Sequence, residues 1–145
     1  MKATTSALHE INGRHKWSVT LSAGVHGPCI LRDSAVSFAT RSEAEEDLET
    51  FLRLEYLGNG IFVRSKEDID ELLAAAVRGR DECKGFWFGK VQWQESDEVG
   101  CNWFFSDFRY DIVGCVGKLL SEIDSMRRMY RIPDERYAVQ PRRLS

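Results

Sequence analysis

The segment KWSVTLSA, residues 16–23, alternates strictly between polar and apolar side chains. A period of two is that of a β-strand, so Trp17, Val19 and Leu21 share one face while the polar side chains share the other. One dry face and one wet face indicate a strand that is covered on one side only. The rest of the chain must therefore supply a second layer that covers the dry face.

Short strands and turns surround this segment. Residues 29–32 and 35–39 follow a turn at 24–28 and indicate two further short strands, so we expect an antiparallel meander of three strands. Residues 1–14 show no period and contain the turn dipeptide Asn12-Gly13. We expect them to form a flexible N-terminal arm.

Two amphipathic helices follow the meander. Thr40 and Glu43 form a capping box at the start of the first helix, which we expect to end near Tyr56, before the Gly-Asn-Gly turn at 58–60. Ser65 caps the second helix and Gly79 ends it. Residues 61–63 between them indicate a short strand. Both helices are expected to cover the sheet.

The most aromatic part of the chain is predicted to be a β-hairpin. Residues 85–95 and 101–105 flank a polar loop at 96–100. Alternation places Trp87 and Trp93 on one face of the first strand and Phe86 and Phe88, with Lys90, on the other. Both faces therefore carry aromatic side chains, although only one face can pack beneath the helices.

The second aromatic face has three interpretations. Other parts of the chain could cover it, or it could bind a partner protein, since Trp and Arg are enriched at interface hot spots. Stacking of single-stranded nucleic acid is disfavoured because few basic residues lie among many acidic ones. The residues expected to bind a partner are Trp87, Lys90, Trp93, Trp103 and Arg109.

A third, long helix is expected from residue 107 or 108 to Ile132-Pro133, because a residue before proline is disfavoured in a helix. Gly114 and Gly117 within it indicate close approach of another element, either the sheet or the same helix of a second subunit in a homodimer. The elements together predict an α+β fold. It is expected to be a two-layer sandwich of three helices, one of them long and C-terminal, on a mainly antiparallel sheet of about five or six strands. The domain would span residues 15–131, followed by a basic tail at 132–145.

Length and charge limit the class of protein. The chain has 145 residues, of which 43% are hydrophobic and 30% charged, so it has the composition of one globular domain rather than a disordered or fibrous chain. The net charge of −3 conceals an uneven distribution. Residues 41–82 carry twelve acidic and six basic side chains, whereas 127–145 carry six arginines and two acidic residues. The overall balance does not indicate bulk attraction to nucleic acid or membrane.

Motifs of catalysis and cofactor binding are absent from the sequence. There is no phosphate-binding loop, no nucleophile elbow and no zinc-ligand spacing, so we expect no cofactor and no metal. His26 and Cys29 are ingredients of a nucleophile or metal site, but a turn histidine and a small buried thiol explain them as well. The sequence shows no export signal and no long apolar span. We therefore expect reduced, buried cysteines and a cytoplasmic protein.

The function expected from these features is that of a small, non-enzymatic protein-binding module of the inhibitor, immunity or anti-defence type. It would act by steric occlusion or charge mimicry through the aromatic hairpin face and the acidic helices. One alternative is a small enzyme or ligand-binding domain with an aromatic pocket and a site built on His26, Cys29 and Tyr110. Another is a nucleic-acid-binding regulator that uses the C-terminal arginines.

Overall fold

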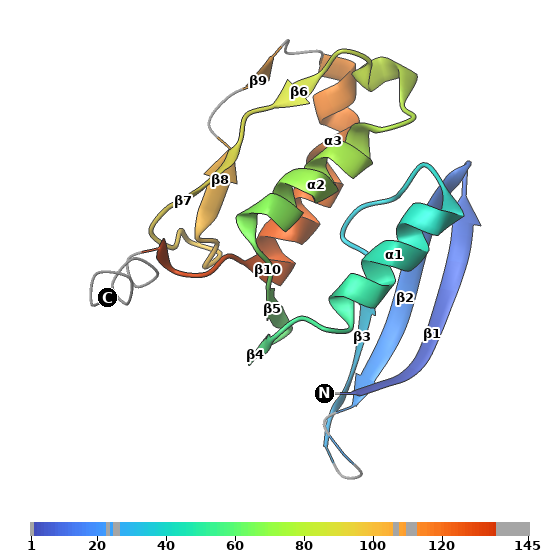
Figure 1. Cartoon of the computed structure of the whole chain (residues 1–145), viewed down its shortest axis with the longest axis vertical. Coiled ribbons are helices and arrows are strands. Elements are labelled where there is room, and N and C mark those ends of the chain that lie inside the picture. The colour runs from blue at the N-terminus through green and yellow to red at the C-terminus, as the bar shows by residue number, and fades with distance from the viewer. Residues whose placement is uncertain (1, 23, 25–26, 106–107, 110–112, 136–145) are drawn as a thin grey trace, which may run out of the picture.

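The fold is α+β, with three α-helices and ten strands in four small sheets among the residues described. These are residues 2–22, 24, 27–105, 108–109 and 113–135 of the computed structural model. Figure 1 shows that α1 lies against the N-terminal sheet, while α2 and α3 lie between that unit and the aromatic hairpin. The strands are thus divided among four sheets, whereas the sequence predicts one sheet of five or six strands.

The N-terminal sheet has the order β1-β2-β3 and is antiparallel throughout; its strands are β1 (Lys2–Ile11), β2 (Arg14–Ser22) and β3 (Cys29–Asp33). The alternation predicted for β2 is confirmed, because Trp17, Val19 and Leu21 are all buried. Residues 34–38 continue as a buried segment rather than a regular third strand, and Phe38 forms an isolated bridge with His15.

The N-terminus differs from the flexible arm that the sequence predicts. Residues 2–11 form β1, which is joined to β2 by a tight turn with φ of 52° at Asn12 and 80° at Gly13. Two left-handed residues in succession are the geometry of a type I′ hairpin turn. β1 lacks a period-two pattern because nearly all of its side chains are exposed. Backbone pairing with β2 therefore holds this strand in place.

Side-chain caps set the starts of α1 (Arg41–Phe51) and α2 (Lys66–Val77), as predicted. The Glu43 N–H donates to Thr40 Oγ1 at 3.1 Å, and the Asp68 N–H donates to Ser65 Oγ at 3.1 Å. α1 ends earlier than expected, because Tyr56 already belongs to a hairpin of β4 (Tyr56–Gly58) and β5 (Ile61–Val63).

The aromatic hairpin is confirmed, but it is interrupted. β7 (Val91–Trp93) pairs with β8 (Trp103–Phe105), and further along β6 (Trp87–Phe88) pairs with β9 (Phe108–Arg109). Asp97 organises the loop between β7 and β8. Its Oδ1 accepts from the N–H groups of Val99 and Cys101, each at 3.0 Å. A short 3₁₀ helix, η1 (Asp81–Cys83), precedes the hairpin.

The last helix, α3 (Val113–Met129), starts later than predicted because residues 108–109 are in β9. It continues into β10 (Tyr130–Arg131), which pairs in parallel with β5. Gly114 and Gly117 do not mark a close contact with the rest of the described chain. A Cβ at Gly117 would meet no described atom within 4 Å, and one at Gly114 would meet only Glu82 at 4.0 Å.

One hydrophobic core is shared by the elements, with its largest fully buried side chains at Trp17, Phe51, Ile69, Leu73, Trp103, Leu119, Met126 and Tyr130. The cysteines differ from the expectation of four reduced, buried thiols. Cys83 and Cys115 form a disulfide that links η1 to α3, and Cys29 is exposed; Cys101 alone is a free, buried thiol. No helix in the described part of the chain is long and apolar enough to cross a membrane. The cytoplasmic location stays a prediction.

Candidate functional site

The two tryptophans of the β7–β8 pair lie opposite each other, and both contribute to the interior. Trp103 is 1% exposed, and its indole N–H donates to the Tyr130 carbonyl at 3.0 Å. Trp93 is half-buried and packs against the core. Trp103 therefore serves the core, and we leave it out of any partner surface.

The other predicted partner-binding residues lie around the interrupted part of the hairpin. Trp87 and Arg109 are paired across β6 and β9, and their side chains lie outside the described part of the structure. Lys90 is exposed between β6 and β7. It lies at a recess of about 270 Å³ that Phe86 and Phe88 line together with apolar residues of α2.

A change of face lets Phe88 and Trp93 both pack against the core. Phe88 and Val91 are both buried, although strict alternation over an odd separation would place them on opposite faces. The strand is interrupted between them at Gly89 and Lys90, so the chain turns its other side toward the core. On the outer face of β7–β8, Gln92 and Phe104 are exposed. Aromatic residues on both faces of the predicted hairpin are therefore weaker evidence for a partner-binding surface.

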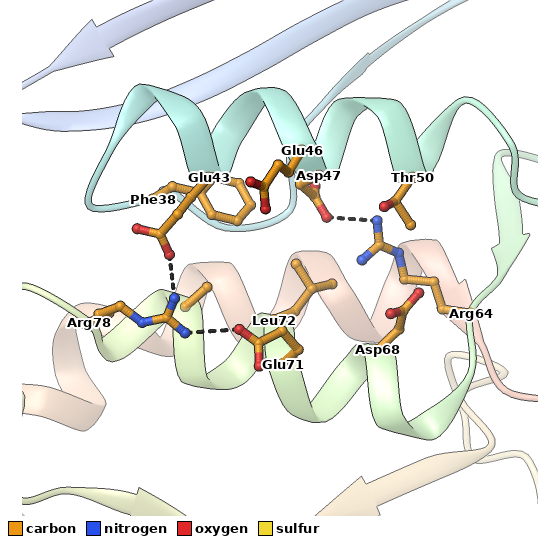
Figure 2. Close-up of a pocket in the computed structure, with 11 residues that line it drawn as sticks. Phe38, Glu43, Glu46, Asp47, Thr50, Arg64, Asp68, Glu71, Leu72 and Arg78 are labelled. Carbon is orange, nitrogen blue, oxygen red and sulfur yellow. Dashed lines mark hydrogen bonds and ion pairs between the residues drawn. The ribbon is translucent and has the colours of Figure 1, made fainter.

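A recess of about 150 Å³ lies between α1 and α2, and acidic side chains dominate its walls (Figure 2). Phe38, Leu72 and Ala75 provide apolar lining. The charged lining comprises five carboxylates and two guanidinium groups, a formal charge of −3: Glu43, Glu46, Asp47, Asp68 and Glu71 against Arg64 and Arg78. We call this recess the acidic groove.

A buried ion pair closes one end of the acidic groove. Asp47 Oδ1 accepts from Arg64 Nη2 at 2.8 Å, and the two side chains are 8% and 2% exposed. Asp47 Oδ2 accepts from the Trp17 indole N–H, also at 2.8 Å. The Arg64 guanidinium lies over the Tyr130 ring, 4.7 Å from its centroid. This network ties α1 to β2, β10 and the segment after β5.

Two polar atoms in the buried network lack hydrogen-bond partners among the described residues: Arg64 Nε and the Tyr130 hydroxyl. Burial raises the pKa of Tyr130 far above its ordinary value, so the hydroxyl stays neutral. The network therefore joins one ion pair, Asp47 and Arg64, to two neutral side chains, Trp17 and Tyr130.

The other end of the acidic groove is held by Arg78. Its guanidinium bridges the two helices by pairing with Glu43 of α1 and with Glu71 of α2, the latter at 2.9 Å. The carboxylates of Glu46 and Asp68 have no hydrogen bond or ion pair within the described part of the chain. Both arginines are thus already engaged, while two carboxylates remain available to a ligand.

Sequence reasoning overlooked Asp47 and Arg64, although both carry a signal. Asp47 lies three residues after Ala44 and four before Phe51, on the stripe that a helix of this period buries. Arg64 lies two residues after the buried Phe62, on the same face of an extended segment. Two opposite charges on two apolar faces would have predicted a buried pair.

The structure offers little for catalysis in the parts that it describes. No group of three or more His, Cys, Asp or Glu side chains is placed to hold a metal there. Burial raises the pKa of the Cys101 thiol, which donates to the Trp103 carbonyl. Cys29 is exposed on β3, and its predicted associates His26 and Tyr110 lie outside the described residues. Comparison with protein-family models, curated proteins and solved structures finds no match.

Proposed function

We propose that the chain is a protein-binding module without catalytic activity, and that its acidic groove receives a basic side chain of the partner. The observation that carries this proposal is the pair of available carboxylates, Glu46 and Asp68, in a groove whose own cations are both engaged. An arginine or lysine of a partner would add the missing positive charge.

The chemistry of the groove fits a long basic side chain. Such a side chain buries its methylene groups against apolar surface and keeps its charged head among polar groups. Phe38 and Leu72 supply apolar lining, and the carboxylates of both helices lie beside them. Arg64 and Arg78 pin the helices together, so the groove is formed before the partner binds, which lowers the ordering cost of association.

The aromatic hairpin supplies a second contact in this proposal. Lys90 and Trp93 remain proposed contact residues, together with Trp87 and Arg109. Engagement of both regions would occlude the partner's surface sterically, while the acidic helices mimic another negatively charged ligand. The partner is a protein with a basic segment rather than a nucleic acid, since phosphates would be repelled by the groove.

Affinity capture followed by direct binding tests the proposal. The purified chain is used as bait, and the dissociation constant of each captured protein is measured with wild type and with E46Q/D68N. The matched control is E49Q/E67Q, which makes the same charge change at exposed positions of the same helices outside the groove. Loss of two charged contacts is expected to weaken binding about tenfold or more. Equal affinities of the two double variants would contradict the groove as the binding site.

A further inference from the structure

We propose that the recess between α2 and the aromatic hairpin is a binding site for a free α-amino acid with an apolar side chain. This recess, which we call the hairpin pocket, has a volume of about 270 Å³ and is lined by residues of α2, by Phe86 and by residues 88–90. Pockets for drug-sized ligands measure about 300–1,000 Å³, so a slightly smaller pocket suits a molecule of amino-acid size. Figure 1 shows the hairpin strands on the side of α2 that faces away from α1, so the hairpin pocket is separate from the acidic groove.

One wall of the hairpin pocket is a single face of α2. The residues of this wall are Asp70, Leu73, Ala74 and Val77. Their spacing of three, four and seven residues places them on one side of the helix. Leu73 is buried and Ala74 is exposed, so the wall runs from the core to the surface. This wall is therefore apolar, with one carboxylate at its N-terminal end.

The second wall comes from the start of the hairpin and is held by aromatic contacts. The rings of Phe86 and Phe88 pack edge to face, with their centroids 4.9 Å apart. Phe88 packs in the same way on Phe105 of β8, at 5.0 Å. Because these contacts hold Phe86 and Phe88 in place, the apolar walls are formed before a ligand binds, which lowers the ordering cost of binding.

Two opposite charges line the hairpin pocket and do not pair with each other. Asp70 supplies a carboxylate and Lys90 an ammonium group, so the charged lining has a formal charge of zero. Asp70 is half-buried, and its Oδ1 accepts from the Val91 N–H at 2.9 Å, which fixes the carboxylate beside the start of β7. Neither Asp70 nor Lys90 forms an ion pair within the described part of the chain. Asp70 Oδ2 and the Lys90 ammonium group therefore both remain available to a ligand.

A zwitterion with an apolar side chain complements this lining. Its ammonium group would donate to Asp70, and its carboxylate would accept from Lys90. Its side chain would lie against the rings of Phe86 and Phe88. An apolar amine, an apolar carboxylate or the end of a peptide carries only one of the two charges and would leave the other charge of the pocket unpaired beside apolar walls. The two charges together thus identify the occupant as a free amino acid.

Isothermal titration calorimetry of the full chain with free amino acids tests the proposal. L-Leucine and L-phenylalanine are the probes, and glycine is the control without an apolar side chain. We expect saturable binding of one probe molecule per chain and no binding of glycine. The N-acetyl derivative of the tighter probe lacks the ammonium group, and its amide lacks the carboxylate. Each derivative should bind at least about tenfold more weakly than the free amino acid, because one charged contact is lost.

Variants of the two charged residues provide a second test. D70N keeps an oxygen that can accept from the Val91 N–H, but it removes the charge. D70N and K90Q should each weaken binding about tenfold or more. The matched controls E67Q and K84Q make the same changes at exposed positions outside the hairpin pocket and should bind as wild type does.

Two further variants locate the site. A74W places a large side chain at an exposed position of the α2 wall and should abolish binding, with a circular dichroism spectrum like that of wild type confirming the fold. The groove variant E46Q/D68N should bind the amino acid as wild type does, which separates this proposal from that of partner binding. Absence of saturable binding of both probes would overturn the proposal. Equal binding of the free amino acid and its N-acetyl derivative, or wild-type binding by D70N and K90Q, would overturn it as well.

Discussion

Replacement of Asp47 by alanine should destabilise the fold more than any change on the exposed faces of α1. The Asp47 carboxylate accepts hydrogen bonds from Arg64 Nη2 and from the Trp17 indole N–H, each at 2.8 Å, and both donor side chains are buried. Removal of one member of a buried ion pair costs about 3–5 kcal/mol, because the remaining charge cannot reach water. We therefore expect D47A to lower the free energy of unfolding by about 4 kcal/mol, a large share of the roughly 5–15 kcal/mol of a typical domain.

Urea denaturation followed by tryptophan fluorescence measures this loss, and E46A is the matched control. Glu46 is the neighbouring residue on α1, is exposed and has no ion pair within the described residues, so its removal should change stability by less than about 0.5 kcal/mol. The double variant D47A/R64M should recover part of the loss, because it removes the stranded charge. A D47A variant within about 1 kcal/mol of wild type would refute the buried network as described.

Four further changes test other parts of the structure. Y130F deletes a buried hydroxyl that has no described partner, so it should stabilise the chain by about 1 kcal/mol in urea denaturation; a clear loss would mean that the hydroxyl is satisfied. G117A should raise helix stability by up to about 1 kcal/mol, and destabilisation on thermal unfolding would instead indicate a close contact at Gly117. C83S opens a link across 32 residues of sequence and should cost about 3–4 kcal/mol, as should reduction of the wild type. Burial raises the pKa of Asp97, but hydrogen bonds from Arg127 and two backbone N–H groups outweigh it, so the pKa lies below its ordinary value. The stabilisation by Asp97 is then fully present above about pH 4, and it is lost as the pH falls through the lowered pKa. Below about pH 4, the free energy of unfolding of D97N should therefore depend less on pH than that of wild type. An equal pH dependence of the two proteins would contradict this.

Local signals in the sequence were sufficient to predict the elements that depend only on nearby residues. The caps at Thr40 and Ser65 start helices where predicted, since an N-cap depends only on residues within one turn. The alternation around Trp17 was equally reliable because one face of β2 is buried and the other is not. These features yield the α+β class and the first two helices.

Elements that depend on distant partners were not predictable in the same way. β1 is a strand only because β2 lies beside it, and its exposed side chains leave no pattern to read. The break at Gly89 redirects the aromatic residues into one core, which a continuous alternation could not show. The pairing of Cys83 with Cys115 likewise depends on the position of α3 relative to η1.

The candidate site was predicted only as an acidic surface of the two helices. The excess of acidic residues at 41–82 is visible in the sequence, but it does not show which carboxylates are engaged. Arg64 and Arg78 decide which carboxylates of the groove are paired. Arg64 lies just before α2, and Arg78 lies at its C-terminal end. Tertiary structure thus converts a charged face into a groove with two available carboxylates.

An NMR titration of the isotope-labelled chain with a short oligo-arginine peptide tests the acidic groove most directly. The proposal predicts saturable amide shifts concentrated at the residues that line the groove, among them Glu46 and Asp68, with loss of those shifts in E46Q/D68N and their retention in E49Q/E67Q. Shifts spread evenly over the acidic surface, or binding that E46Q/D68N leaves unchanged, would contradict it.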